Sequence, residues 1–342
     1  MPFFLVSYSL LATRCSLLYN LPMSFRSGFV SIIGRPNVGK STLLNALIGQ
    51  KLAIVTSKPQ TTRNRIQGIL NVKPGKGTPA GQIVFIDTPG VHKPDTPMNR
   101  RMMEDVREAL EGRDVILLVV DVTQPFGAGD QYVLDMVRNA GGTVFLLLNK
   151  VDRLPDKRAL LPLIERYRQQ LSFDEIFPIS ALKRDGLPAL VAAVLARLPE
   201  SHPWFPRDQV TDQPERFLAG EIIREKLLIS TKQEVPYATA VVVERFEEEP
   251  RLTRIAAAIF VERDGQKKIV IGRGGEMLKK IGTEARLELE RLLATRVYLE
   301  LFVKVRPNWR ESRSFLEELD WRRQLDDLAQ QPSPESSTDD ES

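Results

Sequence analysis

The stretch GRPNVGKSTLLNAL, residues 34–47, decides the fold of the first half of this chain. It comes directly after the apolar run FVSII, residues 29–33, and its leucines at 43, 44 and 47 recur at a helical spacing. An apolar run, a loop with two glycines and an amphipathic segment follow one another. This order predicts a strand, a loop and a helix.

The loop matches the pattern G-x-x-x-x-G-K-S/T at Gly34, Gly39, Lys40 and Ser41. Glycines let backbone amides turn inward around an anion, and the positive end of the helix dipole points at the same place. In this pattern the lysine reaches the outer phosphates and the serine hydroxyl ligates Mg²⁺. A chance match in a glycine turn is the alternative, but the flanking strand and helix argue against it. The loop predicts a nucleotide site without identifying the base.

The segment GQIVFIDTPG, residues 81–90, predicts a second strand of the same site. It brings Asp87 and Gly90 to the carboxyl end of an apolar strand, where open α/β sheets bind ligands. The Asp87 carboxylate is suited to hold the magnesium ion, usually through water. The Gly90 amide is suited to sense a γ-phosphate.

Two further segments identify the base as guanine. In VFLLLNKVD, residues 144–152, an apolar run leads to Asp152, whose two oxygens can accept from the ring NH and the amine of guanine. Adenine offers no such pair of donors. In IFPISAL, residues 176–182, the Ala181 amide suits the guanine carbonyl and Ser180 can brace the loop. Alone the last segment indicates nothing, but in this order the set predicts GTP.

With these segments in order, the chain resembles the translation-factor-like GTPases, and the resemblance implies a switch region before the Asp87 strand. The segment KPQTTRNRIQGI, residues 58–69, occupies that position. Thr62, or Thr61 as the alternative, would then close on magnesium when GTP is bound. Without the surrounding motifs, a Thr-Thr pair before arginines is equally typical of a solvated loop.

The resemblance implies a complete set of site residues. Lys40, Thr62 and Gly90 would act in catalysis, and Ser41, Thr62 and Asp87 would hold Mg²⁺. The implied residues for binding GTP and GDP are Gly34, Asn37, Val38, Gly39, Lys40, Ser41, Thr42, Asp87, Gly90, Asn149, Lys150, Asp152, Ser180, Ala181 and Leu182.

One departure from the family pattern concerns hydrolysis. Many relatives follow the D-x-x-G loop with a glutamine that orients the attacking water, whereas this chain has Val91, whose side chain cannot hydrogen-bond. Hydrolysis is therefore expected to be slow without help. Asn37 and the segment VHKP, residues 91–94, resemble a branch in which K⁺ near the asparagine replaces an arginine finger. His92 is expected to be a solvated or packing residue, with a role as a base as the alternative.

Composition sets further limits. A length of 342 residues predicts about two domains. A hydrophobic content of 42% with 27% charged residues is typical of a globular chain with a core. The single cysteine, Cys15, excludes an internal disulfide, and with only two histidines it disfavours structural zinc. The net charge of +4 slightly favours an anionic partner, and no acidic residue precedes Asp87, so the phosphate loop lies in a positive field.

The order of segments predicts the domain boundaries. Residues 1–23 are an apolar N-terminal extension that a translation start at Met23 explains better than a targeting segment, the alternative. Residues 24–199 form the nucleotide-binding domain, which ends in a helix over 186–198. The proline-rich residues 200–215 read as a linker, and the second domain occupies 216–325. Residues 326–342 predict a disordered acidic tail.

The second domain contains another glycine loop, IGRGG, residues 271–275. It lacks the lysine and serine of a nucleotide loop. We expect a strand before it, a helix after it, and the overall order helix, strand, strand, helix, helix, strand. The order and the loop resemble a KH domain, with Gly272 and Gly275 as the fixed glycines and Arg273 and Gly274 between them.

The KH resemblance implies an RNA-binding role for this loop. Small residues let a sugar-phosphate backbone approach, and Arg273, Lys279 and Lys280 can neutralise phosphates. The alternative is an ordinary glycine turn with solvated lysines. The order of elements and the neighbouring Lys267 and Lys268 argue against it.

A nucleotide-binding domain followed by a KH domain resembles the Era-type GTPase family over about residues 24–325. The resemblance implies an α/β P-loop GTPase domain, with a mostly parallel sheet and helices on both faces, followed by a smaller α+β type II KH domain. It also implies a cytoplasmic monomer, peripherally associated with the inner face of the membrane, that binds small-subunit ribosomal RNA near its 3′ end and assists assembly of the small ribosomal subunit. Two alternatives remain: a GTP-gated RNA chaperone with negligible hydrolysis, which Val91 favours, and a membrane or cell-cycle signalling GTPase with secondary RNA binding.

Overall fold

The structure is a computed structural model that describes residues 25–319 except 57, 59–60, 76–77, 92–94 and 233–234. The predicted N-terminal extension, the acidic tail and His92 lie outside the described residues. The chain divides into two compact units. The first comprises Met1–Leu52, Arg65–Val91 and Val106–Asp212, and the second comprises Ala53–Asn64, His92–Asp105 and Gln213–Ser342.

The first unit is built on a six-stranded sheet in the order β2-β3-β1-β4-β5-β6. Its strands are β1 (Arg26–Ile33), β2 (Ile66–Val72), β3 (Gly81–Asp87), β4 (Val115–Asp121), β5 (Thr143–Asn149) and β6 (Glu175–Ile179). All neighbouring strands are parallel except β2 and β3. Every residue of β3 is buried, as expected of a strand with both faces covered.

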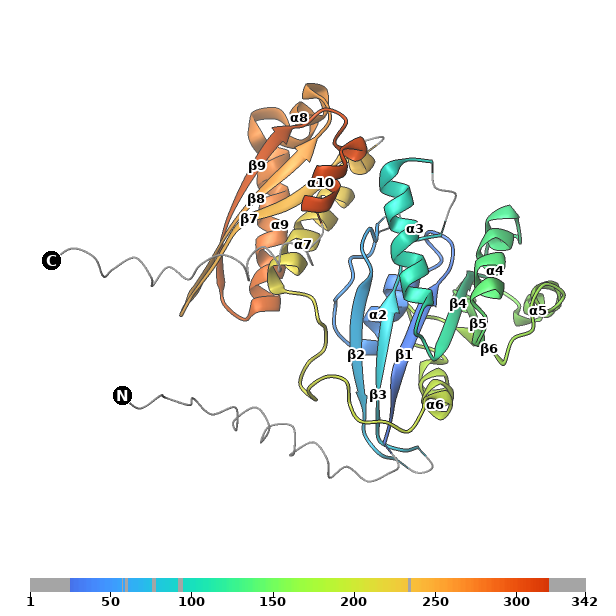
Figure 1. The fold of residues 1–342 in the computed structure, drawn as a ribbon. Helices are drawn as coiled ribbons and strands as arrows, with labels where there is room; N and C mark the ends of the chain where they lie inside the picture. The colour runs from blue at the N-terminus through green and yellow to red at the C-terminus, as the bar shows by residue number, and fades with distance from the viewer. Residues whose placement is uncertain are drawn as a thin grey trace, which may run out of the picture. The chain divides into compact units, whose positions relative to one another are not determined.

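Five helices accompany this sheet. They are α2 (Lys40–Ile48), α3 (Pro97–Leu110), α4 (Ala128–Ala140), α5 (Leu160–Arg168) and α6 (Leu187–Arg197). In Figure 1, α3 lies in front of the sheet and α2 lies behind it. The mostly parallel sheet with helices on both faces is the predicted fold. Because β3, β1, β4 and β5 run parallel, the loops that follow them meet at one edge of the sheet.

The proline-rich segment after α6 packs along the first unit. The backbone amides of Trp204 and Phe205 donate to Gln82 Oε1 at 2.8 and 2.9 Å. The Trp204 ring centroid lies 5.1 Å from that of Phe29. These contacts hold the segment against β1 and β3, so the chain is anchored well before the next helix begins.

The second unit has a three-stranded sheet, β7-β8-β9, in which β7 pairs antiparallel and β9 pairs parallel with β8. Its main elements are α7 (Glu215–Ser230), β7 (Ala240–Glu249), β8 (Leu252–Val261), α8 (Asp264–Ile271), α9 (Glu276–Leu293) and β9 (Arg296–Val305). Helices α7 and α9 lie beside this sheet in Figure 1, and Ile222 and Ile223 of α7 and Leu289 of α9 join the sheet residues in one core. The order of elements is the predicted KH order.

One element of this unit differs from the prediction. The segment that leads into the second glycine loop is helix α8, not a strand. Gln266 Oε1 accepts from the backbone amides of Glu262 at 2.9 Å and Arg263 at 3.1 Å, which fixes the helix start. The short apolar run Ile269–Ile271 has too few residues to distinguish a strand from a helix by its pattern.

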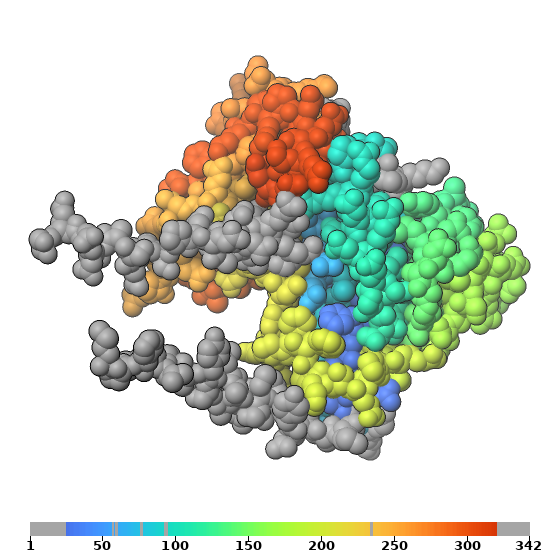
Figure 2. Space-filling view, in the orientation of Figure 1, coloured from blue at the N-terminus to red at the C-terminus, as the bar shows by residue number. Residues whose placement is uncertain are grey.

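The chain after β9 returns to the sheet through a turn, Trp309–Glu311, and helix α10 (Arg313–Glu318). Trp309 is fully buried with Phe315, Met98 and Met102, and its indole Nε1 donates to Ala238 O at 3.0 Å. The part of α3 up to Asp105 belongs to this second unit, and in Figure 2 the red surface of α10 meets the teal surface of α3. The first part of α3 therefore shares a core with the KH sheet.

We expect Trp309→Ala to lower the free energy of unfolding of the second unit by about 3–5 kcal/mol, because a large buried aromatic side chain and its hydrogen bond are lost. Urea unfolding followed by circular dichroism measures this. Tyr298→Ala is the control, since that side chain is 48% exposed. Equal losses in the two variants would contradict the assignment of Trp309 to the core.

Candidate nucleotide-binding site

The phosphate loop joins β1 to α2, and its two fixed glycines are required by space. A Cβ at Gly34 would clash with the carbonyl oxygen of Val119, and one at Gly39 would clash with Asn149 Nδ2. Gly39 also has a left-handed backbone, with φ of 103°. Helix α2 begins at Lys40 with no side-chain cap on its first amides. These amides and the helix dipole are therefore suited to hold an anion.

Lys40 is held over the loop although its side chain is almost fully buried. It is 6% exposed, and its Nζ donates to Gly34 O and Arg35 O, both at 3.0 Å. Burial lowers the pKa of Lys40 to about 8, against the opposing effect of Asp87. The loop thus carries a desolvated ammonium group beside the anion cradle, where its attraction for phosphate is least weakened by water.

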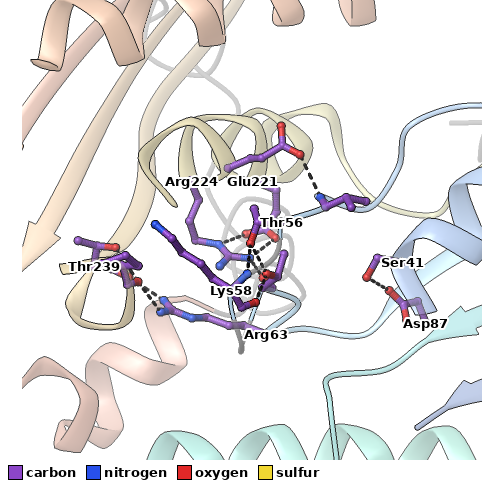
Figure 3. Close-up of polar contacts among 12 residues, drawn as sticks. Ser41, Thr56, Lys58, Arg63, Asp87, Glu221, Arg224 and Thr239 are labelled. Carbon is purple, nitrogen blue, oxygen red and sulfur yellow. Dashed lines mark hydrogen bonds and ion pairs between the residues drawn. The ribbon is translucent and has the colours of Figure 1, made fainter. Parts of the chain in front are cut away.

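Asp87 and Ser41 form the polar pair expected to hold magnesium. Asp87 is fully buried, and its Oδ2 accepts from the Ser41 hydroxyl at 2.6 Å (Figure 3). Its Oδ1 is buried without a hydrogen-bond partner. Burial raises the pKa of Asp87 to about 6, opposed by Lys40 and Ser41. An orphaned carboxylate oxygen beside a hydroxyl fits a hard divalent cation with oxygen ligands.

Asn149 connects the phosphate loop with the loop after β6. It is 2% exposed, its Nδ2 donates to Val38 O at 2.8 Å, and its Oδ1 accepts from Ala181 N at 3.0 Å. The Ala181 amide predicted for the guanine carbonyl is therefore bonded to Asn149 in this structure. Asn149 fixes the distance between two predicted binding loops.

Lys150 adds a second connection and involves a residue that the sequence analysis missed. Its Nζ donates to Asn37 O at 2.7 Å and to Asp121 Oδ2 at 2.5 Å. Asp121 is the last residue of β4, at the same edge of the sheet. Burial opposes its ionisation, but hydrogen bonds from Lys150 and Thr123 lower the pKa of Asp121 overall. Its place at a strand end was the one signal in the sequence, since no motif includes it.

The three residues predicted around the guanine base differ in exposure. Asp152 lies in the short turn Val151–Arg153 with its side chain exposed. Ser180 is 1% exposed, and its Oγ accepts from the Lys183 amide at 3.1 Å. Leu182 is 68% exposed. Ser180 therefore braces the loop, while Asp152 is accessible to a ligand.

The D-x-x-G loop is attached to the phosphate loop. A Cβ at Gly90 would meet Pro36 Cα at 2.7 Å, so only glycine allows this approach. The next amide, Val91 N, donates to Gly34 O at 3.1 Å, and the Val91 side chain is 2% exposed. A buried valine at this position supplies no group to orient a water.

The predicted switch threonines belong to the second unit, whereas Ser41 and Asp87 belong to the first. Thr62 is 7% exposed. Thr61 Oγ1 lies 2.6 Å from Thr56 Oγ1 and donates to Lys58 O at 2.7 Å. Within the second unit, Arg224 of α7 donates to Thr61 O (Figure 3). The segment that would respond to GTP is bonded to the first helix of the KH domain.

The second glycine loop has a left-handed backbone at three of its glycines. Gly272, Gly274 and Gly275 have φ of 74°, 60° and 84°, and a Cβ at Gly272 would meet Met277 Cβ at 2.7 Å. Arg273 is exposed directly before the N-terminus of α9. Lys279 and Lys280 are exposed in its first turns, the latter 3.9 Å from Glu284.

The fold and the site define a P-loop GTPase joined to a KH domain. A family model described as a 50S ribosome-binding GTPase matches residues 29–150, and a KH-domain model matches residues 234–310. The GTPase Era of Syntrophus aciditrophicus (strain SB) is 50% identical over 296 residues, 86% of this chain and 94% of the relative. That of Geobacter metallireducens is 53% identical over 297 residues, 86% of this chain and 97% of the relative. The chain belongs to the GTPase Era family.

Two solved structures agree with this assignment. A crystal structure of a variant of Aquifex aeolicus Era bound to GDP and AlF4⁻ has a TM-score of 0.82 and 39% identity, covering 86% of this chain and 99% of that one. A structure of Era in complex with MgGDPNP and nucleotides 1506–1542 of 16S ribosomal RNA has a TM-score of 0.83 and 39% identity, covering 87% and 99%.

We expect Asp152→Asn to exchange guanine preference for xanthine preference, because an amide donor then faces a base edge that carries a carbonyl in xanthine. The loss of GTP affinity should be about 10- to 100-fold, the equivalent of one hydrogen bond to a charged group. Equilibrium titration with labelled GTP and XTP measures this. Asp156→Asn, an exposed neighbour with the same change in charge, is the control. Unchanged GTP affinity in Asp152→Asn would refute the base assignment.

Proposed function

We propose that this GTPase assists assembly of the small ribosomal subunit by binding single-stranded ribosomal RNA near the 3′ end of the small-subunit RNA. The observation that carries the proposal is the exposed loop Gly272–Gly275 on a chain whose first unit holds a nucleotide site. The left-handed glycines leave room for a sugar-phosphate backbone, and Arg273 stands beside the N-terminus of α9. The relative crystallised with 16S ribosomal RNA supports the choice of RNA.

The nucleotide is held, in this proposal, by the residues assigned from the sequence. Lys40 and the first amides of α2 bind the outer phosphates, and Asp152 binds guanine. Asn149 positions the loops rather than selecting the base, since both ends of its amide are bonded to protein. Ser41, Asp87 and Thr62 would hold Mg²⁺, which supplies positive charge for the phosphates.

Hydrolysis requires a group that the D-x-x-G loop does not supply. Val91 is buried and cannot orient a water. We assign part of the missing charge to K⁺ near Asn37, because Asn37 and the segment VHKP, residues 91–94, resemble the branch of the family that uses this ion. The buried Val91 side chain also favours the second candidate function, a GTP-gated RNA chaperone with negligible turnover.

The place of action is proposed from the family resemblance. The chain acts as a cytoplasmic monomer on the small ribosomal subunit, with peripheral association with the inner face of the membrane. None of the helices in the described part of the chain has the length and apolar character to span a membrane.

Changing Arg273 and Gly274 together to aspartate should abolish RNA binding, because two negative charges would stand where a phosphate must approach. Gly274 has open space around its Cβ position, and aspartate tolerates its left-handed backbone, so the fold should persist. Fluorescence anisotropy with a single-stranded RNA carrying the 3′ end of small-subunit ribosomal RNA measures affinity. Arg251→Asp, in the exposed β7–β8 turn, is the charge control.

The RNA affinity of the unmodified chain should also depend on salt concentration. Log affinity should fall with log salt with a slope of roughly 2 to 4, at about 0.7 per neutralised phosphate. Unimpaired RNA affinity in the double variant, with unchanged circular dichroism and guanine nucleotide binding, would rule out this loop as the RNA site.

A further inference from the structure

The second unit contains a cavity lined by four arginines and, among the described residues, a single carboxylate. The arginines are Arg63, Arg101, Arg216 and Arg224, and the carboxylate is Glu221. The remaining lining is largely apolar side chains from α3, α7, β7 and α10. No residue of the phosphate loop lines this cavity. The lining therefore contains more arginines than carboxylates, and it shares no residue with the phosphate loop.

The one carboxylate, Glu221, is already paired with an arginine of the cavity. Glu221 accepts from Arg224 in a bidentate pair, with Nε–Oε1 at 2.8 Å and Nη2–Oε2 at 2.6 Å (Figure 3). Arg63 instead donates to backbone carbonyls, chiefly Thr239 O at 2.7 Å, and lies over the Trp309 ring at 5.7 Å. Its positive charge is thus matched by dipoles, an aromatic face and the nearby charge of Glu221, and none of the described carboxylates is hydrogen-bonded to it.

Two buried donors in this cluster lack a partner. Arg63 is 7% exposed and Arg224 is 3% exposed, and neither Arg63 Nε nor Arg224 Nη1 makes a hydrogen bond. Buried donors are almost always paired, because an unpaired one loses its bonds to water without compensation. Burial, and then the neighbouring charge of Arg224, lower the pKa of Arg63 to about 9, so the group remains charged at neutral pH.

The size of the cavity limits what can supply the missing acceptor. Its volume is about 60 Å³, counted as space open to the centre of a water molecule. One water needs roughly 10–15 Å³ on this measure, so several waters or one small tetrahedral anion fit. Planar guanidinium groups match phosphate oxygens in pairs of parallel hydrogen bonds. Several waters would fill the space but would add no negative charge beside the guanidinium groups.

We propose that this cavity is an anion site that binds a phosphate group, held by Arg63 and Arg224. Both arginines also position the predicted switch: Arg63 directly follows Thr62, and Arg224 donates to Thr61 O. An anion bound here would be held by Arg224, which attaches this segment to α7, and by Arg63, which attaches it to the residue before β7, Thr239. The site is independent of the proposed RNA loop, since it uses none of residues 272–280.

The test uses the full chain saturated with Mg²⁺ and GDP, so that the nucleotide site is filled. Inorganic phosphate is the probe, and thermal unfolding and titration calorimetry are compared with KCl at the same pH and ionic strength. We expect a melting temperature that rises saturably with phosphate, since a ligand of the folded state stabilises it.

Two glycine variants locate the bound phosphate. Gly220 of α7 lines the cavity, and a Cβ there meets only Val243 Cγ2, at 3.5 Å. Gly220→Leu should therefore fold, occupy the cavity and abolish phosphate binding. Gly282→Leu is the matched control on α9, where a Cβ meets only Leu301 Cδ1 at 3.4 Å, outside the cavity. It should bind phosphate as the unmodified chain does.

Circular dichroism establishes that both variants are folded, and Gly220→Ala, which should weaken binding, replaces the leucine variant if that one is not. Absence of phosphate binding to the unmodified GDP complex would overturn the proposal. Equal phosphate binding by the Gly220 and Gly282 variants would overturn it as well, because the anion would then be bound elsewhere.

Discussion

The side-chain amide of Asn149 is the constraint on which the nucleotide site depends. It donates to the phosphate loop at Val38 and accepts from the loop after β6 at Ala181, while fully buried between them. Only an amide can do both, because a carboxylate would face the Val38 carbonyl with a second acceptor. The same side chain occupies the space that any Cβ at Gly39 would need. The glycine of the phosphate loop and the asparagine of β5 are therefore required by one another.

Around this connection, the charged side chains of the site are held in place by hydrogen bonds within the protein. Lys40 is bonded to loop carbonyls, Lys150 to Asp121, and Asp87 keeps one oxygen unpaired. Each group is buried or half-buried, so its field is weakly screened. Burial raises the pKa of Asp87 and lowers that of Lys40. A bound cation would therefore stabilise the charged form of Asp87, and a bound triphosphate would stabilise the charged form of Lys40. Fixed dipoles of this kind need little reorganisation when the nucleotide reacts.

Much of this architecture is predictable from local sequence. The phosphate loop and the β3 strand are recognisable because glycines and strand ends must occur at fixed spacings, and the KH order follows from apolar periods. A strand was predicted where the structure has helix α8, because the apolar run Ile269–Ile271 is too short to show a period. Asp121 belongs to no motif and acquires its role only through Lys150, a partner 29 residues away.

The grouping of residues 53–64 and 95–105 with the second unit was equally beyond sequence analysis. It depends on contacts such as Arg63 with Thr239 and Met98 with Trp309, which join distant parts of the chain. No local pattern marks Arg63 as a residue that will be buried beside a KH sheet. Its burial is determined by the tertiary structure, including the return of the chain after β9.

These contacts place the predicted switch and the KH domain in one compact unit, so RNA binding is expected to influence GTP turnover. The most direct measurement is single-turnover hydrolysis of GTP by the full chain in KCl, with and without single-stranded RNA carrying the 3′ end of small-subunit ribosomal RNA. We predict a slow rate alone, since Val91 orients no water, and a rate that rises saturably with RNA, with its midpoint at the RNA dissociation constant. The same rate at zero and at saturating RNA would contradict the coupling of the two domains.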